Sequence, residues 1–183
     1  VIEDSAEKLK GLMNGLKENG TISVSSKVVF VDDGSTDSTW KLLEDICQKD
    51  SLFESIKLAH NRGHQNALMA GMMTVKNDCD AVITLDADLQ HDISAIPRFI
   101  DLYEQGNEVV YGIRKSRDGE SGFKKFTGNM FYMLMEMLGT KVIKNHADYR
   151  LLGSKALQAL SRYEESNLFL RGIIPSIGFQ STI

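Results

Sequence analysis

The sequence is poor in cysteine, proline and tryptophan, and it contains no long apolar segment. Only two cysteines, Cys47 and Cys79, occur among 183 residues, which excludes a disulfide-stapled scaffold and favours a reducing, intracellular setting. The two prolines, Pro97 and Pro175, are isolated, and no Ser- or Pro-rich linker divides the chain. No apolar run approaches the roughly 18 residues of a membrane helix. These absences predict one globular domain that we expect to be soluble by itself.

The chain also lacks a strong excess of charge. Its 21 basic and 25 acidic residues leave a net charge of −4, which excludes a protein that coats nucleic acid. A hydrophobic content of 42% and a charged content of 25% exclude disordered and fibrous classes. His60 and His64 have the four-residue spacing of a helical zinc pair, but residues 61–63 (NRG) make a poor helix interior, so we predict no zinc site there.

Apolar residues recur at helical or strand spacing along most of the chain. The pattern predicts a first helix that ends at residues 19–20 and further helices over about 38–49, 65–75 and 93–105. It predicts strands over 27–31, 53–58, 81–85 and 108–112. This alternation indicates an α/β fold with a mostly parallel central sheet flanked by helices. Because right-handed crossovers bring the carboxyl ends of parallel strands to one edge, we expect ligands to bind there.

An acidic turn follows the predicted strand over 81–85. Asp86 and Asp88 are two residues apart, so their side chains point the same way if the strand continues through them. Paired carboxylates suit Mg²⁺ or Mn²⁺, and Gln90 offers a further oxygen ligand. A bound metal would neutralise a departing diphosphate. The alternative is an ordinary polar turn with solvated aspartates, because this motif alone is weakly specific.

Two further turns lie at the expected ligand-binding edge. Asp32 and Asp33 follow the strand over 27–31, where a carboxylate can accept hydrogen bonds from a nucleotide base or a ribose. The alternative, an Asx turn plus a helix cap, is favoured for this segment taken alone. Asn61 and Arg62 precede a predicted helix and are positioned to contact donor phosphates, although a loop cap explains them equally well.

Taken together, these segments resemble the family 2 nucleotide-diphospho-sugar glycosyltransferases. The first three matching segments are residues 31–37 (VDDGSTD), 61–63 (NRG) and 85–90 (LDADLQ). Residues 112–114 (GIR), 147–152 (ADYRLL) and 169–172 (FLRG) resemble the polyprenyl-phosphate branch, which includes dolichol-phosphate mannose synthase and the bactoprenol glucosyltransferases. The similarity covers nearly the whole chain in the expected order. It implies a nucleotide-diphospho-sugar transferase fold of the GT-A type.

The resemblance also implies roles on the donor side. Asp33 matches the residue that reads the nucleotide base, with Asp32 beside it. Asp86 and Asp88 match the metal and diphosphate aspartates, and Gln90 matches a third metal ligand. The implied cofactor is therefore Mg²⁺ or Mn²⁺. The implied donor is a UDP- or GDP-sugar, because Asp33 is compatible with either base.

On the acceptor side, the resemblance implies inverting transfer to a polyprenyl phosphate of the undecaprenyl or dolichyl type. Arg114 matches an acceptor-phosphate contact, Lys124 or Lys125 is a candidate second cation, Asp148 matches the proposed catalytic carboxylate, and Arg150 follows it. A phosphate monoester has a second pKa near 6, so its oxygen is already anionic and needs no strong general base. Asp148 therefore has two interpretations, as a base or as the residue that orients Arg150 or another cation that holds the acceptor phosphate.

The segment from 114 to 125 has five basic residues against two acidic ones, which suits an acidic acceptor and an anionic membrane surface. A solvated flexible loop explains it equally well. Residues 130–135 (MFYMLM) are apolar on every helical face, which favours core or subunit contact over a membrane-facing element. The oligomeric state is open, and a homo-oligomer is compatible with this segment.

Three parts of the family pattern are not found in this sequence. A first strand ending in a Tyr-Asn-Glu type motif is expected before Val1, and a post-catalytic segment and membrane helices are expected after Ile183. We therefore interpret residues 1–183 as one catalytic domain truncated at both ends, from a protein anchored at the cytoplasmic membrane face. The alternatives are a family 2 enzyme acting on a glycan or protein hydroxyl, a nucleotidylyltransferase, and a non-catalytic receiver-like module with an acidic metal pocket.

Overall fold

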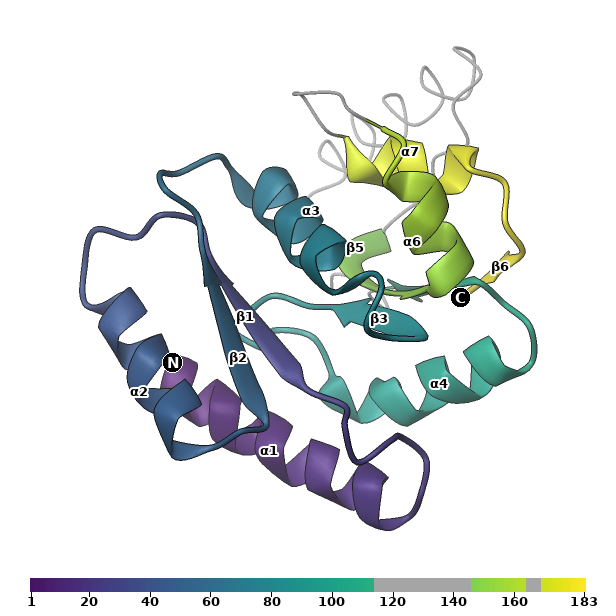
Figure 1. The fold of residues 1–183 in the computed structure, drawn as a ribbon. Helices are drawn as coiled ribbons and strands as arrows, with labels where there is room; N and C mark the ends of the chain where they lie inside the picture. The colour runs from purple at the N-terminus through teal and green to yellow at the C-terminus, as the bar shows by residue number, and fades with distance from the viewer. Residues whose placement is uncertain (114–145, 164–168) are drawn as a thin grey trace, which may run out of the picture.

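The computed structural model describes residues 1–113, 146–163 and 169–183 (Figure 1). Arg114, Lys124, Lys125 and the segment 130–135 lie outside these residues, so their predicted roles stay predictions. The described helices are α1 (Ile2–Glu18), α2 (Thr39–Lys49), α3 (His64–Val75), the 3₁₀ helix η1 (Ile93–Ala95), α4 (Ile96–Glu104), α6 (Ser154–Leu160) and α7 (Leu170–Ser176). The strands are β1 (Val28–Asp32), β2 (Phe53–Lys57), β3 (Ala81–Thr84), β4 (Val109–Ile113), β5 (His146–Gly153) and β6 (Ser181–Thr182).

The strands form a parallel pair and a mixed sheet, which confirms the predicted α/β class. β1 pairs with β2 in parallel, and the second sheet has the order β3-β5-β4-β6. β4 and β6 are parallel, whereas β5 runs antiparallel to both β3 and β4. Because β5 is antiparallel, it begins at the edge where β3 and β4 end. That direction brings its early residues to the edge at which we expected ligands.

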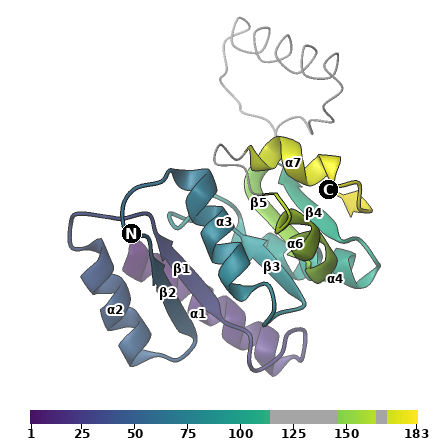
Figure 2. The same cartoon turned by 45° about the horizontal axis from the view of Figure 1, so that its top comes forward.

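Helices cover the sheets on two sides (Figures 1 and 2). On one side, α1 and α2 bury Phe30 of β1, and α1 and α4 bury Val110 and Leu151 of the second sheet. On the other side, Met72 of α3 packs with residues of α6 and α7 against Leu152. Residues 148–153 of β5 are therefore buried between the two layers of helices. None of the helices in the described residues is long and apolar enough to cross a membrane.

The turn after β1 depends on a glycine. Gly34 has a φ of +71°, and a Cβ built on it would lie 2.5 Å from the backbone carbon of His60. The turn therefore packs directly against the loop that follows β2. Since both the left-handed φ and the contact exclude a side chain, only glycine fits here without movement of the backbone.

We expect Gly34→Ala to lower the free energy of unfolding by more than about 2 kcal/mol, because it adds a backbone clash to a strained φ. Gly20→Ala is the matched control: Gly20 has a φ of +75°, but its Cβ would meet nothing within 4 Å. That control should cost only about 1 kcal/mol. Urea denaturation followed by circular dichroism measures both. Equal losses would show that the contact with His60 is unimportant.

Candidate functional site

Asp33 joins the turn after β1 to the loop before α3. One oxygen of its carboxylate accepts a hydrogen bond from the backbone N–H of Arg62 at 2.7 Å, and the other accepts from that of Gly63 at 2.9 Å. Gly63 is the residue immediately before α3. The turn after β1 is therefore joined to the beginning of α3. The Arg62 residue itself is exposed, which leaves its side chain accessible to a ligand.

Asp32 is buried and forms the Asx turn that the sequence offered as an alternative. Its Oδ1 accepts hydrogen bonds from the backbone N–H of Ser35 at 3.2 Å and from the Ser35 hydroxyl. The Oδ2 atom has no hydrogen-bond partner among the described residues, although it is buried. A buried carboxylate oxygen without a donor is costly, so this atom is available to a hydrogen-bond donor of a ligand.

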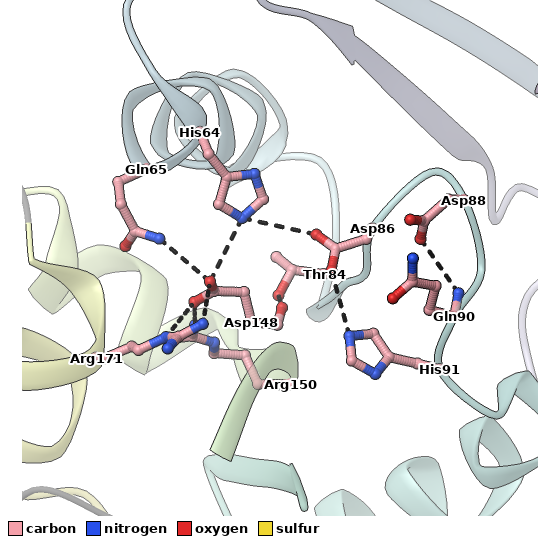
Figure 3. A network of polar contacts seen from close by, with 10 residues as sticks. All are labelled: His64, Gln65, Thr84, Asp86, Asp88, Gln90, His91, Asp148, Arg150 and Arg171. Carbon is pink, nitrogen blue, oxygen red and sulfur yellow. Dashed lines mark hydrogen bonds and ion pairs between the residues drawn. The ribbon is translucent and has the colours of Figure 1, made fainter. Parts of the chain in front are cut away.

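Asp86 and Asp88 lie after the end of β3 and differ in their surroundings (Figure 3). Asp86 Oδ1 lies 3.7 Å from His64 Nε2, and Asp86 Oδ2 lies 3.3 Å from His91 Nε2. Asp88 is exposed and accepts a hydrogen bond from the backbone N–H of Gln90 at 3.2 Å. Leu89, which lies between Asp88 and Gln90, has a left-handed φ of 49°, so the chain reverses sharply at this turn.

His91 supports Asp86 from the interior. Its ring stacks on Tyr149 at a centroid distance of 5.3 Å and an interplanar angle of 8°. The Tyr149 hydroxyl donates to the backbone oxygen of Asp92 at 3.1 Å, and burial raises the pKa of Tyr149 to about 12, so the phenol remains neutral. This packing fixes the His91 ring that faces the Asp86 carboxylate.

The predicted metal ligands have suitable chemistry but are not gathered into a closed site. Within the described residues, no group of three or more His, Cys, Asp or Glu side chains is arranged to hold a metal ion. Asp86, Asp88 and Gln90 supply carboxylate and amide oxygens at one turn, and Mg²⁺ commonly uses only one or two carboxylates together with substrate phosphates and water. The residues therefore fit a cation that arrives with a diphosphate.

Asp148 is the centre of the polar network (Figure 3). Its side chain is 6% exposed and forms a close ion pair with Arg150. Arg171 donates from Nε to Oδ1 at 3.4 Å and from Nη2 to Oδ2 at 2.9 Å. Gln65 Nε2 and His64 Nε2 lie 3.3 and 3.4 Å from Oδ2. This single carboxylate therefore connects β5, α3 and α7.

Burial would raise the pKa of Asp148, but the hydrogen bond from Arg171 and the charges of Arg150 and Arg171 outweigh it, so its pKa lies below the usual value. For Arg150 the effect of burial has the opposite sign: it disfavours the charged guanidinium and lowers the pKa, although the Asp148 charge opposes this shift. A guanidinium still remains protonated at neutral pH. At neutral pH the site thus contains an ionised carboxylate compensated by cations, which makes Asp148 a weak proton acceptor.

Arg150 is positioned differently from our expectation of an acceptor-phosphate contact. It is 1% exposed and lies on the same face of β5 as Asp148, as its two-residue spacing predicts. Its Nε and Nη1 atoms have no hydrogen-bond partner among the described residues. Since its guanidinium is enclosed by the core, Arg150 acts on the site through Asp148 rather than by reaching the surface.

The sequence interpretation missed four residues that the structure brings to the site: His64, Gln65, His91 and Arg171. The motif containing Arg171 was recognised, but nothing in the sequence indicated that it approaches Asp148. His64 was set aside because residues 61–63 do not form a helix. That observation is correct, since α3 begins at His64 itself. The first turn of α3 nevertheless presents this imidazole to two carboxylates.

Residues 6–161 match the sequence model of the family described as Glycosyl transferase family 2, and this match covers most of the chain. The chain belongs to glycosyl transferase family 2. This membership confirms the GT-A type fold and decides against the receiver-like alternative. It also identifies the chain as a glycosyltransferase domain.

Several named proteins are similar to this family 2 domain. YkoT of Bacillus subtilis (strain 168), described as an uncharacterized glycosyltransferase, is 48% identical over 181 residues, which cover 99% of this chain and 54% of YkoT. A bactoprenol glucosyl transferase of Shigella phage SfX is 32% identical over 158 residues, covering 86% of this chain and 51% of that protein. A prophage bactoprenol glucosyl transferase homolog of Escherichia coli (strain K12) is 30% identical over 162 residues, covering 88% of this chain and 52% of that protein.

These relatives agree with the polyprenyl-phosphate branch that the sequence motifs resemble. The chain spans about half the length of the curated relatives it matches. The family 2 match includes Asp148 and Arg150 but ends before Arg171.

We expect Asp148→Asn to lower the free energy of unfolding by about 3 kcal/mol or more, because Arg150 is left as a buried charge without a counterion. Adding Arg150→Met should recover much of this loss. A double-mutant cycle from urea denaturation measures the coupling. Lys10→Met is the control, since Lys10 pairs with Asp50 at the surface at 2.8 Å and its loss should matter much less. Additive effects of Asp148→Asn and Arg150→Met would contradict the coupling.

The depressed pKa of Asp148 also predicts a pH dependence. A group whose folded pKa lies below its unfolded value stabilises the fold above the unfolded pKa, near 4, and loses this contribution as pH falls through the folded pKa. The difference in unfolding free energy between wild type and Asp148→Asn should therefore be largest at neutral pH and shrink below about pH 4. Urea titrations at pH 7 and at pH 3 test this. An unchanged difference would mean that Asp148 does not titrate abnormally.

Proposed function

We propose that this chain is the catalytic part of a family 2 enzyme that transfers a sugar from a nucleotide-diphosphate sugar to a polyprenyl phosphate. The observation that carries the proposal is the compensated carboxylate of Asp148, which lies close to the acidic turn containing Asp86. The names of the bactoprenol glucosyl transferase relatives support the same acceptor class.

The electrostatics of Asp148 favour an acceptor that is already anionic. A sugar or protein hydroxyl needs a general base to remove its proton, and such a base works best with a pKa near the operating pH. The pKa of Asp148 is shifted away from that range, because arginines stabilise its charged form. A phosphate monoester carries a charged oxygen at neutral pH and needs no such base. This argument supports the orienting interpretation of Asp148 over the general-base interpretation.

The proposed reaction is a direct displacement at the anomeric carbon of the sugar. An acceptor phosphate oxygen forms the new bond to that carbon, while the bond from the carbon to the donor diphosphate breaks and the diphosphate takes the electron pair. The configuration of the carbon is inverted. No proton needs to be transferred to complete this step. The protein has to align the two substrates and stabilise negative charge on the departing diphosphate.

On the donor side, Asp32, Asp33 and Arg62 would bind the nucleotide and its phosphates. Asp86, Asp88 and Gln90 would hold Mg²⁺ or Mn²⁺, which would neutralise the diphosphate. The buried and unpartnered Oδ2 of Asp32 supports a hydrogen bond to the donor. The exposure of Asp88 supports a cation shared with a substrate.

Donor and acceptor subsites would be neighbours. His64 Nε2 lies 3.7 Å from Asp86 and 3.4 Å from Asp148, so one imidazole spans the distance between the two carboxylates (Figure 3). This spacing supports in-line attack between two bound substrates. We propose further that Arg114 and Lys125 contact the acceptor phosphate, and that the whole protein acts at the cytoplasmic membrane face.

The proposal predicts sugar transfer by the full-length protein, supplied with Mg²⁺ or Mn²⁺ and either a UDP- or a GDP-sugar. Polyprenyl phosphate and free glycans are offered side by side, and labelled product is measured. We expect product on the lipid phosphate alone. Product on the glycans alone would overturn the proposed acceptor and favour the hydroxyl-directed alternative.

The metal role is tested with Asp88→Ala in the same assay. We expect turnover to fall by at least about a hundredfold, because the variant loses a carboxylate that would hold the metal ion neutralising the leaving diphosphate. Asp45→Ala on the exposed surface of α2 is the matched control and should retain wild-type turnover. Unchanged turnover in Asp88→Ala would remove Asp88 from the metal site.

A further inference from the structure

We propose that Arg171 contacts the phosphate of the acceptor, and that Asp148 and Gln65 are positioning residues that hold its guanidinium. This inference rests on the function proposed above. It gives a role to Arg171, which lies in a segment that resembles the polyprenyl-phosphate branch but to which the resemblance assigned no contact, and which lies beyond the family match.

Arg171 is held along one edge and open along another. Its Nε and Nη2 atoms donate to the two oxygens of Asp148 at 3.4 and 2.9 Å, the paired geometry in which a guanidinium binds a carboxylate most firmly. The Arg171 side chain is 45% exposed, whereas that of Asp148 is 6% exposed. Among the described residues, Nη1 of Arg171 donates no hydrogen bond. A planar donor group is therefore fixed in direction and accessible to a ligand.

The charges of the cluster favour an anion at this position. Arg150 and Arg171 carry two positive charges, and Asp148 carries one negative charge between them. Because Arg150 is enclosed by the core, it compensates Asp148 from the inside. The remaining positive charge is therefore presented by Arg171, the only exposed member of this group of three. An anionic phosphate oxygen would compensate it.

Gln65 fixes the same region through the backbone. Its Oε1 accepts a hydrogen bond from the backbone N–H of Leu170 at 3.2 Å, while its Nε2 donates to Asp148 at 3.3 Å. One amide thus binds the residue before Arg171 and the carboxylate that holds Arg171. Glutamate has the same shape but lacks the Nε2 donor, and it would place a second negative charge beside Asp148. Gln65→Glu therefore removes the hydrogen bond that positions Asp148 and Arg171, while the size and shape of the side chain stay the same.

The location of Arg171 favours the acceptor over the donor. In Figure 3, Asp148 lies between Arg171 on one side and His64 and Asp86 on the other. The residues proposed to hold the donor diphosphate, Asp86 and Asp88, are on the far side of His64. A phosphate bound at Arg171 would therefore approach the sugar from the side opposite the departing diphosphate, as direct displacement requires.

Arg171→Gln and Arg171→Lys in the full-length protein test the inference, with Arg162→Gln as the matched control because Arg162 is an exposed arginine in the turn that follows α6. We expect Arg171→Gln to raise the KM for polyprenyl phosphate by roughly tenfold to a hundredfold, the loss of a charge-assisted hydrogen bond. The KM for the nucleotide sugar should change less than about twofold. Arg171→Lys should recover part of the loss, because it keeps the charge but not the planar donor pair.

Gln65→Glu should raise the same acceptor KM while leaving the donor KM unchanged, which a general loss of packing would not do. The inference is overturned if Arg171→Gln leaves the acceptor KM unchanged, or raises only the donor KM, while wild type transfers sugar to the lipid. If wild type transfers no sugar to polyprenyl phosphate, the proposed function itself fails. Calorimetry with farnesyl phosphate and no donor then tests directly whether Arg171 contacts the phosphate. Equal affinity of wild type and Arg171→Gln for farnesyl phosphate would overturn that contact.

Discussion

The compensation of one buried carboxylate determines how the site is built. Asp148 carries a charge where solvent hardly reaches, and such a charge is tolerated only when it is paired and hydrogen-bonded. The chain meets this requirement with Arg150 from the same strand, Arg171 from α7 and Gln65 from α3. The arrangement of three separate elements is thus coupled to the ionisation of one side chain. The same coupling reduces the basicity of Asp148, which agrees with the proposed acceptor, a phosphate that needs no general base.

The direction of β5 makes this cluster possible. If β5 ran parallel to its neighbours, its first residues would lie at the opposite edge, remote from the acidic turn after β3. Because it is antiparallel, Thr84 pairs with Arg150, and the Thr84 hydroxyl donates to the backbone oxygen of Asp148 at 2.7 Å. The residues proposed to bind the donor and those proposed to bind the acceptor therefore share one edge, although they come from distant parts of the sequence.

Much of the fold could be predicted from the sequence because its signals are local. The strand ending at Asp32 and the helix beginning near His64 follow from apolar spacing and turn residues, and the structure places both within a residue or so of the expected positions. The motifs also singled out Asp86 and Asp148, which the structure brings to either side of His64. The partners of Asp148 could not be predicted, because an arginine that binds a ligand and one that binds a carboxylate look the same in sequence. The burial of Arg150 depends on helices packing over β5, which is a tertiary property.

The long-range hydrogen bonds of Gln65 also bear on how the domain folds. This side chain bridges 83 residues of sequence to Asp148 and 105 residues to Leu170. Closing such long loops costs more conformational entropy than forming local contacts does, so we expect these two hydrogen bonds to form late and slowly. The β1–β2 pair with α1 and α2 contains only nearby residues and can assemble first. During synthesis, the ribosome must therefore release the chain through Arg171 before the polar network can close, and until then Asp148 and Arg150 have no complete interior to occupy.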